Sequence, residues 1–326
     1  MKRLFWIIPL VIIGGILIFV LYLKFALPNV GPAPDIKVKV TPERLERGKY
    51  LAENVMLCMD CHSHRDMTKF SGPLTGLPYA GGGDEFTEEL GAPGDFYAPN
   101  LTPYHLGDWT DGEIYRAITA GVSKDGRALF PVMPYHLYGQ ASLEDIYAVI
   151  AYIRTLPSYE NTVPDPKPKF PFSIILNTIP KKIEHGRIPD KSNLVAYGEY
   201  MTTIAGCIDC HTPMEKGKFI MEEAYSGGME FRLPTGIVRS TNITPHEETG
   251  IGYWDDETFV ARFKAYQDSL FTPYSVEEGF NTIMPWTMYA KMDSFDLKAI
   301  FAYLQTLEPI KKETELFTPA NKLTEN

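Results

Sequence analysis

Two five-residue stretches, CMDCH at residues 58–62 and CIDCH at residues 207–211, decide how this chain of 326 residues is interpreted. Together they contain all four cysteines of the chain. The Cys-x-x-Cys-His pattern is the attachment signature of c-type haem: two thiols form thioethers with the haem vinyl groups, and the histidine reaches the iron. The sequence therefore predicts two covalently attached haem c groups. The predicted binding residues are Cys58, Cys61 and His62 for the first haem, and Cys207, Cys210 and His211 for the second.

Three other uses of the cysteines remain open at this point. A zinc site made of both Cys-x-x-Cys pairs would join stretches 149 residues apart and leaves the two histidines without a role. A thioredoxin-like redox pair is expected as one motif in a βαβ setting, which this sequence lacks. Structural disulfides are the third alternative. Haem is the interpretation that also accounts for the histidines.

The segments around the two stretches repeat in the same order. The matching landmarks are Gly48-Lys49-Tyr50 with Gly198-Glu199-Tyr200, Tyr79–Gly82 with Tyr225–Gly228, Asn100–Pro103 with Asn242–Pro245, Trp109 with Trp254, and Met133-Pro134-Tyr135 with Met284-Pro285-Trp286. Internal similarity of this kind indicates a tandem duplication. We therefore expect two similar domains, each with one haem.

The second axial ligand of each iron is expected from the far side of the haem. Met133 and Met284 follow their histidines by 71 and 73 residues, and each precedes a proline and an aromatic residue. Histidine–methionine ligation raises the reduction potential and fills both axial positions, which suits electron transfer. The competing residues are Met56, Met67 and His136 for the first haem, and Met288 and Met292 for the second. The remaining histidines are expected on the surface or in loops.

Helices are expected at the start and at the end of each repeat. Thr41-Pro42-Glu43 is typical of a helix N-terminus, and apolar residues at helical spacing precede Pro157 and Pro309. The Gly- and Pro-rich stretch 72–94 is predicted to be a long loop around a prosthetic group. The expected fold class is all-α. Gly48 and Gly198 either permit a close helix crossing or mark helix ends.

Two further landmarks have two interpretations each. The side chains of Asn100 and Asn242, with the indoles of Trp109 and Trp254, could donate hydrogen bonds to the haem propionates. Alternatively, the asparagines cap turns and the indoles belong to the core. The sequence leaves both interpretations open.

The amino-terminal segment differs from the rest of the chain. Residues 4–23 contain no charge, and 20 residues of helix span about 30 Å, the thickness of a bilayer core. A cleaved signal peptide is the alternative, but its apolar region is usually shorter and ends at an Ala-x-Ala-like site, which is missing here. A retained membrane anchor is expected.

The distribution of charge follows the division into two repeats. Residues 45–160 and 191–310 each carry a formal net charge of −8, and the proline-rich strip 161–190 between them carries +2. Two acidic bodies argue against nucleic acid as a partner. A basic docking protein is compatible with this charge.

These motifs together resemble the class I cytochrome c domain over residues 45–310, and in particular the tandem cytochrome subunits of membrane-bound alcohol, gluconate and aldehyde dehydrogenases. Those subunits usually bear three haems, whereas this chain has two motifs. The resemblance implies the thioether, histidine and methionine roles named above. The expected division is an anchor helix (1–24), a tether (25–44), a first cytochrome domain (45–160), a linker (161–190), a second cytochrome domain (191–310) and a tail (311–326).

The expected function is electron transfer between a dehydrogenase or quinol-oxidising complex and a terminal oxidase or soluble cytochrome. The chain is expected to be an electron carrier and not an enzyme, held in the cytoplasmic membrane with its haem domains on the periplasmic side. The alternatives are a dihaem peroxidase, which needs one open iron position, and a structural zinc protein.

Overall fold

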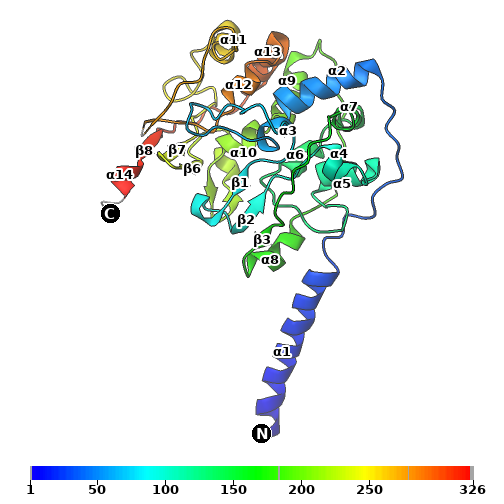
Figure 1. Cartoon of the computed structure of the whole chain (residues 1–326). Helices are drawn as coiled ribbons and strands as arrows, with labels where there is room; N and C mark the ends of the chain where they lie inside the picture. Colours follow the sequence, from blue (N-terminus) through cyan, green and yellow to red (C-terminus); the bar gives the residue numbers. More distant parts are fainter. Residues whose placement is uncertain (1, 183, 278, 324–326) are drawn as a thin grey trace.

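One long helix stands apart from the rest of the molecule in the computed structural model, which describes residues 2–182, 184–277 and 279–323. Helix α1 (Lys2–Phe25) projects from one side of a globular body that holds the remaining elements (Figure 1). Its stretch Ile7–Phe25 is long and apolar enough to cross a membrane and is not buried against the body. This agrees with the expectation of an apolar amino-terminal helix.

Each half of the body begins and ends with a helix, as the sequence predicts. In the first half these are α2 (Pro42–Tyr50), which continues into a π-helical turn (Leu51–Val55), and α7 (Leu143–Ile153). The side chain of Thr41 accepts a hydrogen bond from the backbone N–H of Arg44, so the predicted N-cap is confirmed. In the second half the corresponding helices are α9 (Leu194–Ile204) and α13 (Ser294–Leu304).

The first and last helices of each half cross at a glycine. A Cβ atom on Gly48 would lie 1.9 Å from the carbonyl oxygen of Ala148, and one on Gly198 would lie 1.8 Å from that of Ala299. Real carbon and oxygen atoms cannot approach so closely. These glycines therefore permit a close helix crossing, which is the first of the two interpretations that the sequence left open.

Short helices carry the sequence motifs between these long ones. They are α3 (Cys58–Cys61), α4 (Pro103–Leu106), α5 (Asp111–Ala120), α6 (Tyr135–Tyr138), α8 (Phe172–Ile175), α10 (Cys207–His211), α11 (Asp256–Lys264), α12 (Trp286–Tyr289) and α14 (Ala320–Leu323), with 3-10 turns at Glu88–Leu90, Leu176–Thr178 and Met221–Glu223. Both Cys-x-x-Cys-His stretches thus fold as a single helical turn, which places the two thiols of each pair on adjacent positions of one turn.

The expectation of an all-α fold is wrong, because the loops contain three small antiparallel sheets. Their strands are β1 (Glu85–Phe86), β2 (Gly94–Tyr97) and β3 (Lys167–Pro168); β4 (Met214–Glu215) and β5 (Lys218–Phe219); and β6 (Glu230–Leu233), β7 (Gly236–Arg239) and β8 (Phe317–Pro319). Strands of two to four residues are too short to show the alternation by which strands are recognised in a sequence. The fold is mixed, with helices around the core and sheets in the loops.

The segments that the sequence marks as linker and tail each add an edge strand. Strand β3 of the linker pairs with β2, with Gly94 opposite Pro168, and β8 of the tail pairs with β7, with Ile237 opposite Thr318. Both segments are therefore attached to the body.

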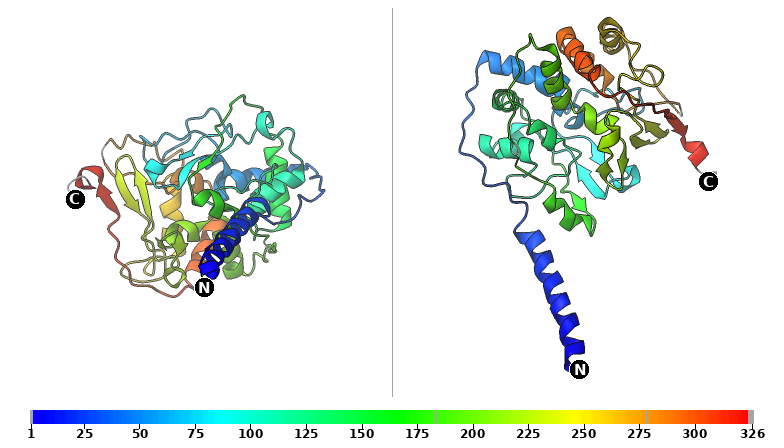
Figure 2. Two further views of the ribbon diagram at one scale, coloured as in Figure 1. Left: turned by 90° about the horizontal axis from the view of Figure 1, so that it is seen from below. Right: turned by 180° about the vertical axis from the view of Figure 1, so that it is seen from behind.

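The buried apolar residues of the two halves form one continuous cluster. Leu51, Ile146 and Ile150 of the first half and Met201 and Leu297 of the second are among its members. Figure 2 shows α2 and α9 close together in the same layer in the view from behind. The two halves therefore share an interface, on which both Cys-x-x-Cys-His turns border.

Candidate functional site

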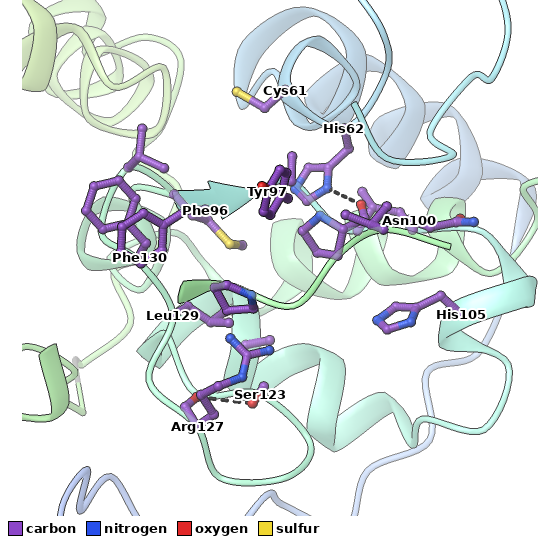
Figure 3. Close-up of a pocket in the computed structure, with 18 of the residues that line it drawn as sticks. Cys61, His62, Phe96, Tyr97, Asn100, His105, Ser123, Arg127, Leu129 and Phe130 are labelled. Carbon is purple, nitrogen blue, oxygen red and sulfur yellow. Dashed lines mark hydrogen bonds between the residues drawn. The ribbon is translucent and has the colours of Figure 1, made fainter. Parts of the chain in front are cut away.

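A cavity of about 480 Å³ lies beside the first Cys-x-x-Cys-His turn. Cys61 and His62 lie on one side of it (Figure 3), and Cys58 and Met133, which precedes α6, line the same cavity. Four of the predicted site residues therefore meet at one place although 71 residues separate His62 from Met133. The volume lies within the range of ordinary ligand pockets, and the lining is mostly apolar.

His62 is held in the form that a metal requires. Its Nδ1 lies 2.7 Å from the carbonyl oxygen of Pro99, and because a carbonyl only accepts, Nδ1 carries the proton and donates it. Burial lowers the pKa of His62 to about 4, so the ring is neutral near pH 7. The Nε2 lone pair is therefore available to a ligand in the cavity.

The second half repeats the hydrogen bond that orients the histidine. The Nδ1 of His211 donates to the carbonyl oxygen of Thr241 at 2.7 Å, and burial lowers the pKa of His211 as well. Cys207 begins the same helix α10 four residues before His211, and Met284 precedes α12; both side chains pack at the edge of the shared core.

The two Cys-x-x-Cys pairs are not joined by disulfides, and burial raises the pKa of Cys58 and Cys207 to about 12. Within residues 2–182, 184–277 and 279–323, no three Cys, His, Asp or Glu side chains come together as a metal site. The described residues therefore do not bring the two Cys-x-x-Cys pairs together into one zinc site.

The competing methionines occupy different surroundings from Met133 and Met284. Met56 and Met292 are 1% exposed and belong to the apolar core, and Met288 is buried as well. Met67 lies against Gly72. Met133 and Met284 are half-buried, and Met133 is the methionine among the described residues that lines the first cavity. Met133 therefore shares the cavity with His62, and the assignment of Met133 and Met284 as ligands stays a prediction.

His136 has another partner. Its Nε2 lies 3.1 Å from the carboxylate of Asp209, and His136 does not line the first cavity. His185 contacts the hydroxyl of Tyr115, and His246 lies 3.2 Å from the hydroxyl of Thr249. His64 is exposed. His105 is exposed on α4, as expected, and also borders the cavity.

The two asparagines of the repeated Asn-x-Thr-Pro segments are turn caps. The amide oxygen of Asn100 accepts from the backbone N–H and the hydroxyl of Thr102, and its NH₂ donates to the carbonyls of Tyr159 and Asn161. Asn242 makes the same pair of bonds to Thr244 and donates to the carbonyl of Ile310. The NH₂ donors of Asn100 are both in use, so this side chain has none left for a propionate.

Comparison with known proteins supplies relatives, although no family model matches the chain. It is 28% identical over 293 residues to the cytochrome c subunit of alcohol dehydrogenase (quinone) from Gluconacetobacter polyoxogenes, covering 82% of this chain and 56% of that protein. It is 30% identical over 247 residues to the fructose dehydrogenase cytochrome subunit of Gluconobacter japonicus, covering 70% and 46%. It is 25% identical over 268 residues to a diheme cytochrome c-type protein of Cereibacter sphaeroides, covering 78% and 83%.

The chain is a relative of dehydrogenase cytochrome c subunits. It spans about half the length of the first two of these proteins. The resemblance predicted from the motifs is thereby confirmed. These relatives are named as cytochrome subunits and not as catalytic subunits, so the likeness supports an electron carrier with covalently bound haem c.

The residues around the first cavity fit such a cytochrome. Two thiols, a neutral imidazole with a free Nε2 and a thioether surround an apolar space, and these are the groups that attach and ligate a haem c. Arg127 and Trp109 also line the cavity, and Arg127 approaches from the side opposite His62 (Figure 3). Both carry N–H donors.

A buried charge cluster next to this site has no counterpart in the sequence prediction. Arg65 lies 3.1 Å from the carboxylate of Asp60 and 3.6 Å from that of Asp84. Burial raises the pKa of Asp84 to about 7. Both motifs contain an aspartate at the same position, Asp60 and Asp209, and this repetition could have pointed to the cluster in the sequence. The partners of the two aspartates differ, however: Arg65 in the first half and His136 in the second.

Proposed function

We propose that the chain is a membrane-anchored dihaem c-type cytochrome that transfers electrons between a dehydrogenase or quinol-oxidising complex and a terminal oxidase or soluble cytochrome. The observation that carries this proposal is the arrangement at His62: its ring is fixed by Pro99, neutral, and faces the cavity that Met133 also lines. His211 makes the equivalent hydrogen bond in the second half, and Met284 holds the position of Met133 in the sequence repeat.

Each residue of the proposed sites has a distinct task. Cys58 and Cys61, and Cys207 and Cys210, would hold the two haems as thioethers, so that neither haem dissociates. His62 and His211 would bind the irons through Nε2, since their Nδ1 atoms are engaged by backbone carbonyls. Met133 and Met284 would complete the coordination. Haem c supplies reversible one-electron transfer at its iron.

The polar groups of the first cavity would receive the haem propionates. Arg127 offers a guanidinium, which pairs well with carboxylates, and Trp109 offers an indole N–H. Asn100 is not needed for this role, because it closes the turn of residues 100–102 and binds the segment after α7.

The interface between the halves favours electron transfer within the chain. Asp209, inside the second motif, is bonded to His136, three residues from Met133. Helix α6, just after Met133, also contacts α9 of the second half, and α12, just after Met284, contacts the turn Leu51–Val55 of the first half. Both proposed haems would therefore border on one packed interface.

Helix α1 would anchor the cytochrome in the cytoplasmic membrane, with the amino terminus inside and the haems on the periplasmic side. In the cytochromes that this chain resembles, haem is attached covalently after export, on the outer side of the cytoplasmic membrane. This supports the proposed orientation. Protease treatment of intact spheroplasts would test it. Degradation of the haem domains is expected, and complete protection would contradict the orientation.

A redox titration with cyanide as a probe tests the carrier against the peroxidase. The reduced-minus-oxidised absorbance should follow two one-electron steps, and neither ferric haem should bind cyanide rapidly, because Met133 and Met284 would complete the coordination of both irons. Rapid cyanide binding to either haem would contradict the carrier proposal and favour the peroxidase.

A further inference from the structure

The linker between the halves is folded against the base of the body. Residues 167–182, called here the foot segment, begin with β3 and continue through α8. Phe172 lies edge-on to Phe96 and Phe130, which stack on each other with ring centroids 4.0 Å apart, and Leu176 belongs to the same small apolar cluster. One side of the foot segment is thereby fixed.

The same segment contacts the membrane-spanning helix at its end. The side-chain NH₂ of Asn177 donates to the carbonyl oxygen of Leu23 at 3.2 Å, and both α8 and the turn after it contact α1. Leu23 lies in the last turn of α1, where the carbonyls have no partner within the helix. Figures 1 and 2 both show α8 at the base of the body, beside the end of α1. The foot segment therefore lies at the level where α1 would leave the bilayer.

The outward side of the foot segment is apolar and basic. Phe170 is 80% exposed, Ile175 is 47% exposed, and Phe25 at the end of α1 is 74% exposed. Single exposed apolar residues are common on proteins, but these continue a membrane-spanning surface. Lys24, Lys167, Lys181 and Lys182 are exposed as well, whereas Lys169 is paired with Glu88. Exposed aromatic and basic side chains together are typical of segments that lie in the headgroup layer.

We propose that the foot segment is a second membrane contact, which inserts Phe170 and Ile175 into the lipid headgroup layer beside α1. This inference rests on the membrane anchorage in the proposed function. It has a consequence for the first haem site, because Ser173, Leu176 and Asn177 of the foot segment line the first cavity. The foot segment therefore holds that cavity at the membrane surface, whereas the second half lies farther from the end of α1.

Thiol accessibility in the full-length holoprotein tests this contact. The native cysteines are blocked by haem in the loaded protein, so one introduced cysteine reports on one position. The variants are Phe170→Cys and Ile175→Cys in the foot segment, Ile16→Cys in the middle of α1, and Leu270→Cys, which replaces a 71% exposed residue of the second half. Each is reconstituted in nanodiscs of phosphatidylcholine and phosphatidylglycerol and treated with a charged, membrane-impermeant thiol reagent.

Cysteines at positions 170 and 175 should react about tenfold more slowly than the cysteine at 270, since each unit by which a lipid surrounding raises a thiol pKa removes about nine-tenths of the thiolate. Equal rates at 170, 175 and 270, with position 16 protected, would overturn the foot contact alone. Rapid reaction at position 16 would instead contradict the membrane anchorage. The haem absorbance of every variant shows whether it is folded, and positions 170 and 175 test the contact independently.

Discussion

The hydroxyl of Tyr50 donates a hydrogen bond of 2.7 Å to the carboxylate of Asp296, across 246 residues of sequence. The equivalent tyrosine of the second half, Tyr200, donates at 2.6 Å to Asp145 of the first half. Each half thus supplies a tyrosine from its first helix and an aspartate from its last helix to the other. The same hydroxyls accept from the backbone N–H groups of Asp293 and Ser142, which begin those last helices. The interface has the approximate two-fold symmetry of the sequence repeat.

Removing the two hydroxyls should destabilise the contact between the halves. Tyr50→Phe and Tyr200→Phe are each expected to lower the free energy of unfolding by about 1–3 kcal/mol, as for other hydrogen bonds to buried charged groups. Tyr197 still donates to Asp296, and Arg47 to Asp145, which limits the loss. Denaturant unfolding of the holoprotein measures the effect. Tyr253→Phe is the control, since Tyr253 is exposed, and equal stability of all variants would contradict a role for these bonds.

The helix crossing of the second half should not tolerate a methyl group. Gly198→Ala places a Cβ atom 1.8 Å from the carbonyl oxygen of Ala299, so α9 and α13 must separate. We expect a loss of about 1–3 kcal/mol or more in unfolding free energy, as for other overpacked cores. Gly15→Ala is the matched control, because a Cβ atom there meets nothing within 4 Å. Normal stability of Gly198→Ala would show that the crossing is looser than described.

Asp84 should make stability depend on pH. Burial raises the pKa of Asp84 from its ordinary value of 3.8 to about 7, against the opposing effect of Arg65. The folded chain therefore binds more protons than the unfolded chain between about pH 4 and pH 7, and the contribution of Asp84 to stability is lost as the pH rises through that window. We compare the unfolding free energies of the natural chain and of Asp84→Asn. The value for the natural chain, relative to the variant, should decrease by a few kcal/mol from pH 4 to pH 7, because each pKa unit corresponds to about 1.4 kcal/mol. Denaturant midpoints measured across this range test it. A difference that stays constant with pH would mean that Asp84 has an ordinary pKa.

The two methionines should control one haem each. Met133→Ala and Met284→Ala are each expected to lower one midpoint potential by roughly tenths of a volt and to let that ferric haem bind cyanide, because an open axial position loses the stabilisation of ferrous iron. Met221→Ala, at a position 54% exposed, is the control. Redox titration with and without cyanide gives both readouts. An unchanged pair of potentials in Met284→Ala would point to Met288 or Met292 as the ligand.

The sequence predicted those features that rest on local pattern or on repetition. The cap at Thr41 and the helices before Pro157 and Pro309 followed from local residue pattern, and the place of Met133 in the repeat led to a residue that lines the cavity beside His62. Repetition compensated for weak local signals, since one methionine among 12 carries little information by itself.

Contacts between the two halves could not be predicted in this way. The bond from Tyr50 to Asp296 depends on how two domains pack, and nothing in either segment signals its partner. The same holds for Arg65, which pairs with Asp60 and Asp84 in the first half only. Strand β3 was missed because Lys167-Pro168 has no strand pattern of its own and becomes a strand by pairing with β2. The prolines around it led instead to the prediction of a linker between the two domains.

Haem stoichiometry tests the central claim most directly. The haem content per chain, measured by the pyridine haemochrome spectrum and by intact mass, should be two for the natural sequence. It should be one for the paired variant Cys58→Ala with Cys61→Ala, and one for Cys207→Ala with Cys210→Ala. A natural chain with one haem or none, or a paired variant that keeps two, would contradict the assignment of one covalent haem to each Cys-x-x-Cys-His turn.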